Sequence, residues 1–138
     1  MKCATMVLLA TAAVAVPALA QSGGPASRMR PQPIAITMTD HGFAPSRFSL
    51  RGGARYVLRI ANRSGTGHNL TQNAFFANAG IAPEDCRAAN GGQISLRPGE
   101  SVVIRLRAPD TRPGGTYQFT STVLGDAGKD YKGVFVIR

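Results

Sequence analysis

Apolar and polar residues alternate along much of the chain, and this alternation predicts short β-strands. The clearest example runs from Arg55 to Asn62, where Tyr56, Leu58 and Ile60 would share one face of a strand. Such a pattern is typical of a strand that buries one face and leaves the other in solvent. By the same rule we predict further strands at residues 33–39, 48–50, 68–70, 93–96, 101–107, 117–119 and 134–136.

Turn-forming residues separate these strands at nearly regular intervals. Glycine or proline occurs within residues 51–54, 63–67, 97–100 and 108–115. Residues 72–90 differ, because Pro83-Glu84-Asp85 is typical of the first turn of a short helix, which Gly91-Gly92 would end. Seven or eight short strands with one helical insertion predict an all-β protein, an antiparallel sandwich of two sheets.

Residues 1–20 have the pattern of a secretory signal peptide. Lys2 gives a positive start, residues 6–16 are apolar, and Ala18-Leu19-Ala20 is a small-x-small cleavage site. The apolar run is too short to cross a membrane as a helix. We therefore expect cleavage after Ala20 and export to the periplasm or the cell exterior. A flexible tether is expected at residues 21–32 and a single domain at residues 33–138.

The cysteines constrain how the exported domain is held together. Cleavage would remove Cys3 and leave Cys86 as the sole cysteine of the mature chain, so no disulfide within one mature chain is expected. Apolar burial would then have to stabilise the domain, which is feasible at this size. Cys86 would be buried, act as a metal ligand or cross-link two chains; we expect a monomer.

The chain is strongly basic, with a formal net charge of +9 that arginine mostly supplies. The arginines in or beside predicted strands alternate with apolar residues, so we expect them to face solvent; they are Arg47, Arg51, Arg55, Arg59, Arg63, Arg97, Arg105 and Arg107. A surface of this kind favours anionic partners, such as lipid head groups or an acidic protein. The sequence shows no nucleic-acid-binding motif, so no nucleic-acid partner is expected.

Several motifs follow one another in a specific order. They are Ile34-x-Ile36-x-Met38-x-Asp40-x-Gly42-Phe43-x-Pro45, Leu50-Arg51-Gly52-Gly53, the strand at residues 56–62, Gly67-His68-Asn69-Leu70, Arg97-Pro98-Gly99-Glu100-Ser101 and Tyr117-x-Phe119. In this order they resemble a cupredoxin, the family of blue-copper proteins that includes plastocyanin. The resemblance spans about residues 33–138 and implies a Greek-key β-sandwich with one copper ion at one end.

The resemblance also implies where the copper ligands would lie. His68 matches the family's first copper histidine, and Asn69 matches the residue that ties its strand to the cysteine loop. Ser121 stands at the position of the cysteine, Leu124 within residues 123–126 at that of the second histidine, and Tyr131 at that of the methionine. A blue-copper site needs a thiolate, two imidazoles and usually a weak thioether. The chain contains no Cys, His or Met after Cys86.

A different metal site is an alternative. The family topology would bring His41 to the same end of the sandwich as His68, where Cys86, Asp126 or Tyr131 would complete a copper or zinc site. The competing interpretation places His41 on the surface, buries Cys86 as a small apolar residue and hydrogen-bonds His68 to the loop. Tyr131 would then pack on His68, and Asn69 would hydrogen-bond to Ser121 or Thr122.

The leading hypothesis is an exported cupredoxin-like protein without an intact type 1 copper site and without a cofactor. It would act as a binding or accessory module of the cell envelope, and its partner would be another envelope protein or an anionic surface. The alternative is a copper-handling or delivery protein with a non-blue site around His68. An electron carrier is less favoured, because the chain lacks the ligands that a redox metal would need. No catalytic grouping is recognisable in the sequence, so no enzymatic activity is expected.

Overall fold

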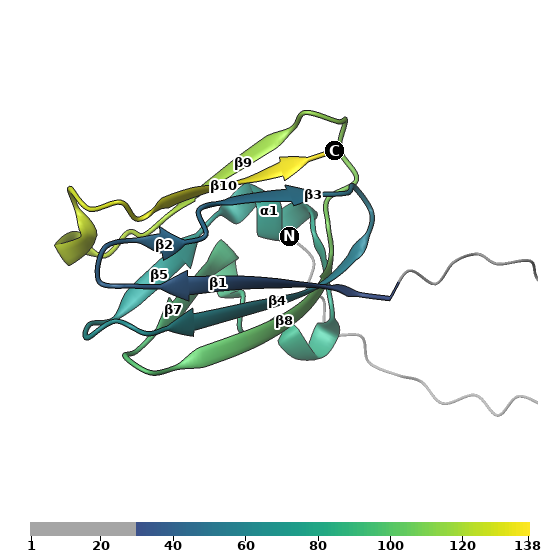
Figure 1. The fold of residues 1–138 in the computed structure, drawn as a ribbon. Helices are drawn as coiled ribbons and strands as arrows, with labels where there is room; N and C mark the ends of the chain where they lie inside the picture. Colours follow the sequence, from purple (N-terminus) through teal and green to yellow (C-terminus); the bar gives the residue numbers. More distant parts are fainter. Residues whose placement is uncertain (1–29) are drawn as a thin grey trace, which may run out of the picture.

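Residues 30–138, which a computed structural model of the chain describes, form a sandwich of two five-stranded sheets (Figure 1). The first sheet contains, in spatial order, β2 (Phe43–Ala44), β1 (Gln32–Met38), β4 (Arg55–Asn62), β8 (Ser101–Arg107) and β6 (Gly80–Ile81). The second contains β3 (Arg47–Leu50), β10 (Lys132–Ile137), β9 (Thr116–Thr120), β5 (His68–Thr71) and β7 (Gln93–Leu96). The predicted signal peptide and nearly all of the tether lie outside the described residues.

β4 forms the centre of the first sheet, and its alternation decides which face is buried. Tyr56, Leu58 and Ile60 are buried, whereas Arg55 and Arg59 are exposed. β8 pairs with β4 antiparallel and β1 pairs with it in parallel, in registers that align their inward-facing apolar residues. One face of this sheet therefore packs on the core, and the other carries arginines into solvent.

The second sheet is built around the hairpin of β9 and β10. β10 is antiparallel to β9 and parallel to β3, so that Phe135 lies opposite Tyr117 on one side and beside Phe48 on the other. β9 joins β5 through one paired position, Thr71 opposite Thr120. The chain beyond Thr120 then leaves the sheet and forms the long loop of the hairpin.

The predicted two-sheet β-sandwich is confirmed, with a difference in strand direction. Two neighbouring pairs, β1 with β4 and β3 with β10, are parallel, so both sheets are mixed. Alternation reports which side chains are buried and carries no information on the direction of the neighbouring strand. The described residues contain ten strands because β2 and β6, of two residues each, add to the eight longer ones.

The helical insertion begins earlier than the sequence predicts. Helix α1 spans Asn73–Asn78, and Gln72 caps it by accepting a hydrogen bond from the backbone N–H of Ala74. Three short 3-10 helices also occur: η1 (Pro83–Asp85), η2 (Asn90–Gly92) and η3 (Leu124–Asp126). The proline signal therefore starts a single turn. The longer helix forms where two phenylalanines can be buried, which the local start signal does not reveal.

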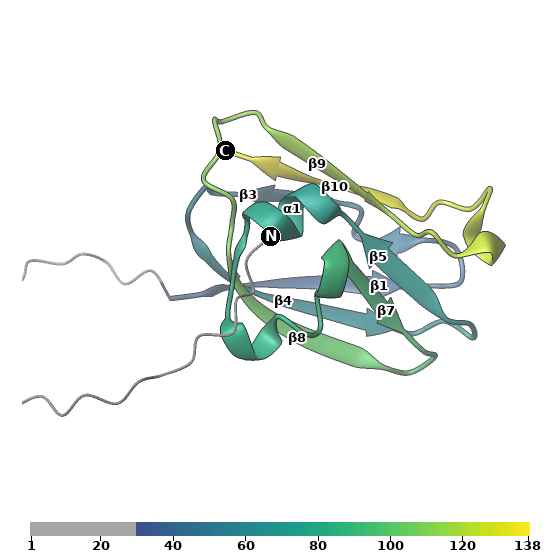
Figure 2. The same ribbon diagram turned by 180° about the vertical axis from the view of Figure 1, so that it is seen from behind.

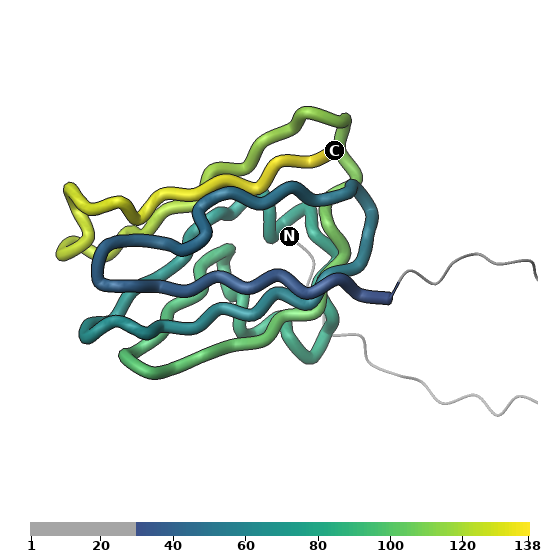
Figure 3. The backbone as a smooth tube through the Cα atoms, in the orientation of Figure 1, coloured from purple at the N-terminus to yellow at the C-terminus, as the bar shows by residue number. Residues whose placement is uncertain are grey.

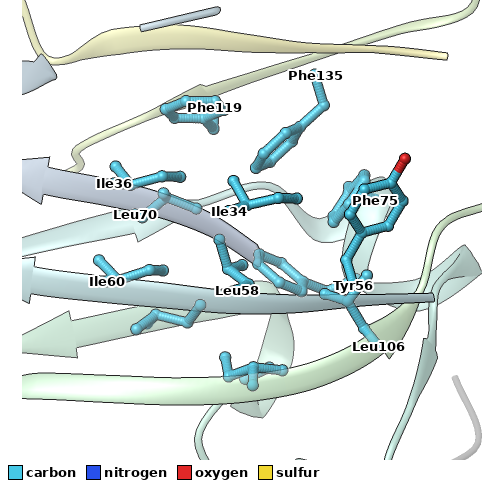
Figure 4. Close-up of a cluster of buried hydrophobic side chains, with 14 of the residues drawn as sticks. Ile34, Ile36, Tyr56, Leu58, Ile60, Leu70, Phe75, Leu106, Phe119 and Phe135 are labelled. Carbon is cyan, nitrogen blue, oxygen red and sulfur yellow. The ribbon is translucent and has the colours of Figure 1, made fainter. Parts of the chain in front are cut away.

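Aromatic side chains fill the space between the sheets (Figure 4). Phe75 from α1 stacks on Phe135 of β10 with ring centroids 4.3 Å apart, and Phe135 lies 4.7 Å from Phe119 of β9. All three are at most 1% exposed. Figure 2 shows α1 between the two sheets at one side of the sandwich, where it delivers Phe75 to this cluster. Burial of such rings is the main stabilising contribution of the core.

Within residues 30–138, no helix combines the length and the apolar character needed to cross a membrane.

Gly133 in β10 is required by the packing of the core. It lies directly opposite Phe119, whose ring covers it. A Cβ at this position would collide with that ring and lie 2.8 Å from the carbonyl oxygen of Ser46. Because backbone and a buried ring meet there, neither neighbour can move aside cheaply.

We therefore expect Gly133→Ala to lower the free energy of unfolding by about 1–3 kcal/mol, the usual cost of overpacking. The measurement is urea unfolding at neutral pH. Gly125→Ala is the matched control, because a Cβ there meets no atom within 4 Å, and its effect should stay within about 0.5 kcal/mol. Equal losses for the two variants would contradict this account of Gly133.

Candidate functional site

Three loops meet at the end of the sandwich where β5 begins (Figure 3). They comprise residues 39–42 between β1 and β2, residues 63–67 between β4 and β5, and residues 121–131 between β9 and β10. The backbone N–H of Asp130 donates to the carbonyl of His41 at 3.1 Å. The N–H of Gly65 donates to the carboxylate of Asp40 at 3.0 Å. Each loop is thus bonded to at least one other.

His68, the first residue of β5, is buried beneath these loops and is 2% exposed. Its Nδ1 lies 2.8 Å from Oδ2 of Asp126, which is also buried. Its Nε2 lies 3.0 Å from Oγ1 of Thr66 and 2.9 Å from the hydroxyl of Tyr131. The ring of Tyr131 stacks on the imidazole with centroids 4.4 Å apart. Both ring nitrogens and one face of the ring are therefore engaged.

The positions of the protons follow from the partners. A carboxylate accepts hydrogen bonds, so the N–H of His68 is at Nδ1 and donates to Asp126. The hydroxyl of Tyr131 donates to the carbonyl oxygen of Thr39. With that proton committed, Tyr131 does not donate to Nε2, and the hydroxyl of Thr66 is the other group within hydrogen-bond distance of this nitrogen. Every polar atom of the cluster has a partner, and no buried side-chain nitrogen or oxygen within residues 30–138 lacks one.

A turn centred on Asn62 presents Thr66 to His68. The side-chain amide of Asn62 donates to the carbonyls of Thr66 and Leu96 at 2.8 and 3.1 Å. Its Oδ1 accepts from both the backbone N–H and the hydroxyl of Ser64, at 3.0 and 2.7 Å. Asn62 is 1% exposed. The loop after β4 is therefore fixed by one buried amide, which sets the position of the Thr66 hydroxyl.

Asn69 ties β5 to the β9–β10 loop through Thr122. Its Nδ2 donates to Oγ1 of Thr122 at 2.9 Å, and its Oδ1 accepts from the Thr122 backbone N–H at 2.8 Å. Ser121 bonds elsewhere, since its hydroxyl donates to Oδ2 of Asp126. Two neighbouring loop residues are thus held by different partners, and the carboxylate of Asp126 accepts from both His68 and Ser121.

Burial and nearby negative charge change the acidity of Tyr131. Burial raises the pKa of its hydroxyl to about 12, and the carboxylates of Asp126 and Asp40 add to the shift. A tyrosine hydroxyl in this state remains a proton donor at neutral pH. This is consistent with its hydrogen bond to the carbonyl of Thr39.

Three candidate residues lie apart from this cluster. His41 contributes its backbone carbonyl, but its side chain is exposed. Leu124, at the alignment position of the second histidine, is 91% exposed. Cys86 follows η1, whose Asp85 bonds to Arg105 near the far end of β8. The structure therefore groups His68, Tyr131, Ser121 and Asp126 and separates them from the other three.

The sulfur of Cys86 is disulfide-bonded in this chain, which still contains residues 1–20. The expectation of no disulfide concerns the mature chain from which Cys3 has been removed, and Cys3 lies outside the described residues, so that expectation stays a prediction. A sulfur in a disulfide is not a thiolate, so Cys86 supplies no metal ligand in this form.

The residues at this end do not fit a type 1 copper ion. Such a site needs a thiolate sulfur and two imidazoles, whereas Ser121 supplies a hydroxyl that is bonded to Asp126. His68 has both nitrogens in hydrogen bonds. Within residues 30–138, no group of three or more His, Cys, Asp or Glu side chains gathers in a way that could hold a metal ion.

Comparisons with known proteins support the fold. No protein-family model matches the sequence, and no curated protein is similar to it. Reduced auracyanin from the photosynthetic bacterium Roseiflexus castenholzii superposes with a TM-score of 0.55 and 21% identity, over 78% of this chain and 97% of that one. Auracyanin B gives 0.52 and 22%, over 78% and 88%.

A third similar structure is larger. The Cu-containing nitrite reductase from Thermus scotoductus SA-01 superposes with a TM-score of 0.56 and 15% identity, over 78% of this chain and 31% of that one. At these identities the similarity establishes the fold, which is that of the cupredoxins. The resemblance in the sequence motifs is therefore confirmed at the level of the fold.

The sequence placed Asp126 near His68 only as a candidate metal ligand, and it identified neither the hydrogen bond between these two residues nor Thr66. Asp126 falls within residues 123–126, where the resemblance places the second histidine, so its position was a usable signal. The side-chain type of Asp126 was not a usable signal, because an acidic residue in a loop is usually solvated. Nothing in the sequence marks Thr66, because its contact with His68 depends on the turn that Asn62 holds.

Replacement of Asp126 tests whether the cluster stabilises the fold. Asp126→Ala would leave the buried Nδ1 of His68 and the partly buried hydroxyl of Ser121 without their acceptor. We expect a loss of about 1.5–3 kcal/mol, the range for hydrogen bonds to charged groups. Chemical unfolding measures it. Glu84→Ala removes an exposed ion pair with Arg105 and should cost less than about 1 kcal/mol. If the two variants lost similar amounts of unfolding free energy, the cluster would stabilise the fold no more than an exposed ion pair does.

The pKa of Tyr131 predicts how stability depends on alkaline pH. Because folding raises this pKa from about 10 to about 12, the native state favours the protonated hydroxyl. The contribution is complete below pH 10 and is lost as the pH rises from about 10 to about 12, up to about 2.7 kcal/mol. Unfolding free energies of the wild type should therefore fall more steeply over this window than those of Tyr131→Phe. Parallel curves would mean that Tyr131 is not buried as described.

Proposed function

We propose that this chain is an exported module of the cell envelope that uses the cupredoxin fold for binding and not for electron transfer. The observation that carries the proposal is the buried cluster around His68. Where the resemblance places copper ligands, the chain has a closed hydrogen-bond network with Asp126, Thr66 and Tyr131. A blue-copper electron carrier needs a thiolate and a second imidazole in this place.

The physical effect of the network is to hold the loops without a metal. Asp126 and Tyr131 belong to the β9–β10 loop, Thr66 to the loop after β4, and Thr39 to the loop after β1. Their hydrogen bonds converge on or beside one imidazole, as a metal ion would draw ligands from separate segments. A rigid end without a redox centre suits a binding or accessory role.

Export supports the envelope as the place of action. The signal-peptide pattern of residues 1–20, with cleavage after Ala20, leads to the periplasm or the cell exterior. The net charge of +9 favours a partner that carries negative charge, either another envelope protein or an anionic surface.

Copper handling with a non-blue site is the second candidate, and one observation favours it. The imidazole of His68 lies beside a carboxylate and two hydroxyls, and imidazole and carboxylate are both ligands of copper and zinc. Binding would require the metal to displace a satisfied hydrogen bond on a ring that is 2% exposed. We therefore place this function second.

An enzymatic role is not proposed, although Asp126, His68 and Thr66 stand in the order acid, base and hydroxyl. The distances of 2.8 and 3.0 Å would suit such a relay. The hydroxyl of Tyr131, however, occupies the same Nε2 at 2.9 Å, and its ring covers one face of the imidazole. The base is thus enclosed by its own partners.

A metal titration separates these functions. The purified protein is titrated with Cu(II) and with Cu(I) and followed by absorption spectroscopy and calorimetry, alongside His68→Ala and the exposed-histidine control His41→Ala. The proposal expects no binding tighter than about 1 μM in any of the three proteins.

Two results would overturn the proposal. Tight binding that His68→Ala abolishes and His41→Ala retains would establish copper handling at the buried site. An intense thiolate-to-copper charge-transfer band in the visible spectrum would establish a blue-copper centre.

A further inference from the structure

A groove runs over the outer face of the first sheet, far from His68. It has a volume of about 400 Å³ and lies where the first residues of β4 and the residues of β6 flank the last residues of β8. Its lining includes Arg55, Arg105, Arg107, Val57, Ile81 and Pro31. We call it the arginine groove. It is separate from the cluster of buried polar residues at the opposite end of the sandwich.

The register of the strands places like charges side by side in this groove. Arg55 on β4 is directly opposite Arg107 on β8, and Arg105 is opposite Val57, the next outward residue of β4. β1, β4 and β8 contain no acidic residue. Like charges directly opposite each other on one face of a sheet are destabilising. The fold itself therefore gains nothing from this pairing.

The three arginines differ in their partners. Arg105 is held by Asp85, with bonds of 2.8 and 3.1 Å, and by Glu84 at 3.1 Å. The hydrogen bond with Arg105 also lowers the pKa of the Asp85 carboxyl. Arg55 and Arg107 are exposed, and within residues 30–138 their side chains have no hydrogen bond or ion pair. Two guanidinium groups from adjacent strands are thus available to one ligand.

The chemistry of the groove indicates the ligand. A pair of guanidiniums suits a phosphate group, because each offers a planar pair of donors to two phosphate oxygens. The partly exposed Val57 and Ile81 and the exposed Pro31 supply apolar surface beside the charges. A ligand with a phosphate next to an apolar part matches both features, and an anionic phospholipid has this composition.

We propose that the arginine groove binds the phosphate head group of an anionic phospholipid and so attaches the protein to a membrane surface. Arg55 and Arg107 contact the phosphate, while Val57 and Ile81 pack on the glycerol and the first acyl carbons. Arg105 is held back by its two acidic partners and shapes the wall of the groove. The inference rests on the proposed binding role and specifies its partner.

Binding to vesicles tests the groove directly. The probes are vesicles of phosphatidylcholine with and without phosphatidylglycerol, measured by co-sedimentation at constant ionic strength. The double variant Arg55→Gln, Arg107→Gln removes the two available guanidiniums. The matched control Arg47→Gln, Arg97→Gln removes two exposed arginines outside the groove, so both variants carry the same net charge.

We expect the groove variant to bind anionic vesicles about thirtyfold more weakly than the wild type, from about a fivefold to sixfold loss per arginine. The control variant should lose far less of its affinity for anionic vesicles. All three proteins should bind only weakly to vesicles of pure phosphatidylcholine. The groove variant should be no less stable than the wild type in urea, because it relieves a like-charge pair. This keeps a loss of binding distinct from a loss of folding.

Three outcomes would overturn the inference. Equal losses in the two variants would show that total charge, and not the groove, attracts the membrane. Competition by inorganic phosphate at millimolar concentration, with no gain from the lipid, would assign the site to free phosphate. Polyglutamate serves as a probe for an acidic protein partner. If the groove variant lost binding to polyglutamate but kept its binding to vesicles, the partner would be an acidic protein. The result is independent of the copper titration, so failure of one leaves the other intact.

Discussion

The hydrogen bond from Nδ1 of His68 to Asp126 is the interaction on which one end of the sandwich depends. It joins two residues that are 58 positions apart in the sequence, and both side chains are at most 2% exposed. A buried carboxylate is costly unless hydrogen bonds compensate it, and Asp126 also accepts from Ser121. The same imidazole also contacts Tyr131 and Thr66, so one ring joins two loops, and Tyr131 connects them to a third through Thr39.

The two ends of the molecule use polar groups in opposite ways. Around His68, each donor meets an acceptor within the protein, which makes that end self-sufficient and closed. At the far end of β4 and β8, Arg55 and Arg107 face each other in solvent. A surface that keeps like charges adjacent without satisfying them points to a ligand from outside. The sandwich thus separates a structural network from an interaction surface along one pair of strands.

The fold was largely predictable because its strands bury one face each. The alternation of Tyr56, Leu58 and Ile60 reports the burial of β4 without any knowledge of its neighbours. The parallel pairing of β1 with β4 and of β3 with β10 was not predictable, since direction depends on which distant strand arrives alongside. The position of α1 was missed for a similar reason: Phe75 and Phe76 form a helix where the core accepts them.

The sequence by itself determined which chemistry is missing from the chain. No Cys, His or Met follows Cys86, and no arrangement of the backbone can create a thiolate or an imidazole. Only the tertiary structure decided what takes their place, because hydrogen bonds between His68, Asp126 and Thr66 depend on loops whose meeting is set by the packing of two sheets. The sequence sets the type of each residue, whereas the hydrogen-bond partner of a side chain depends on distances between atoms that only the folded chain has.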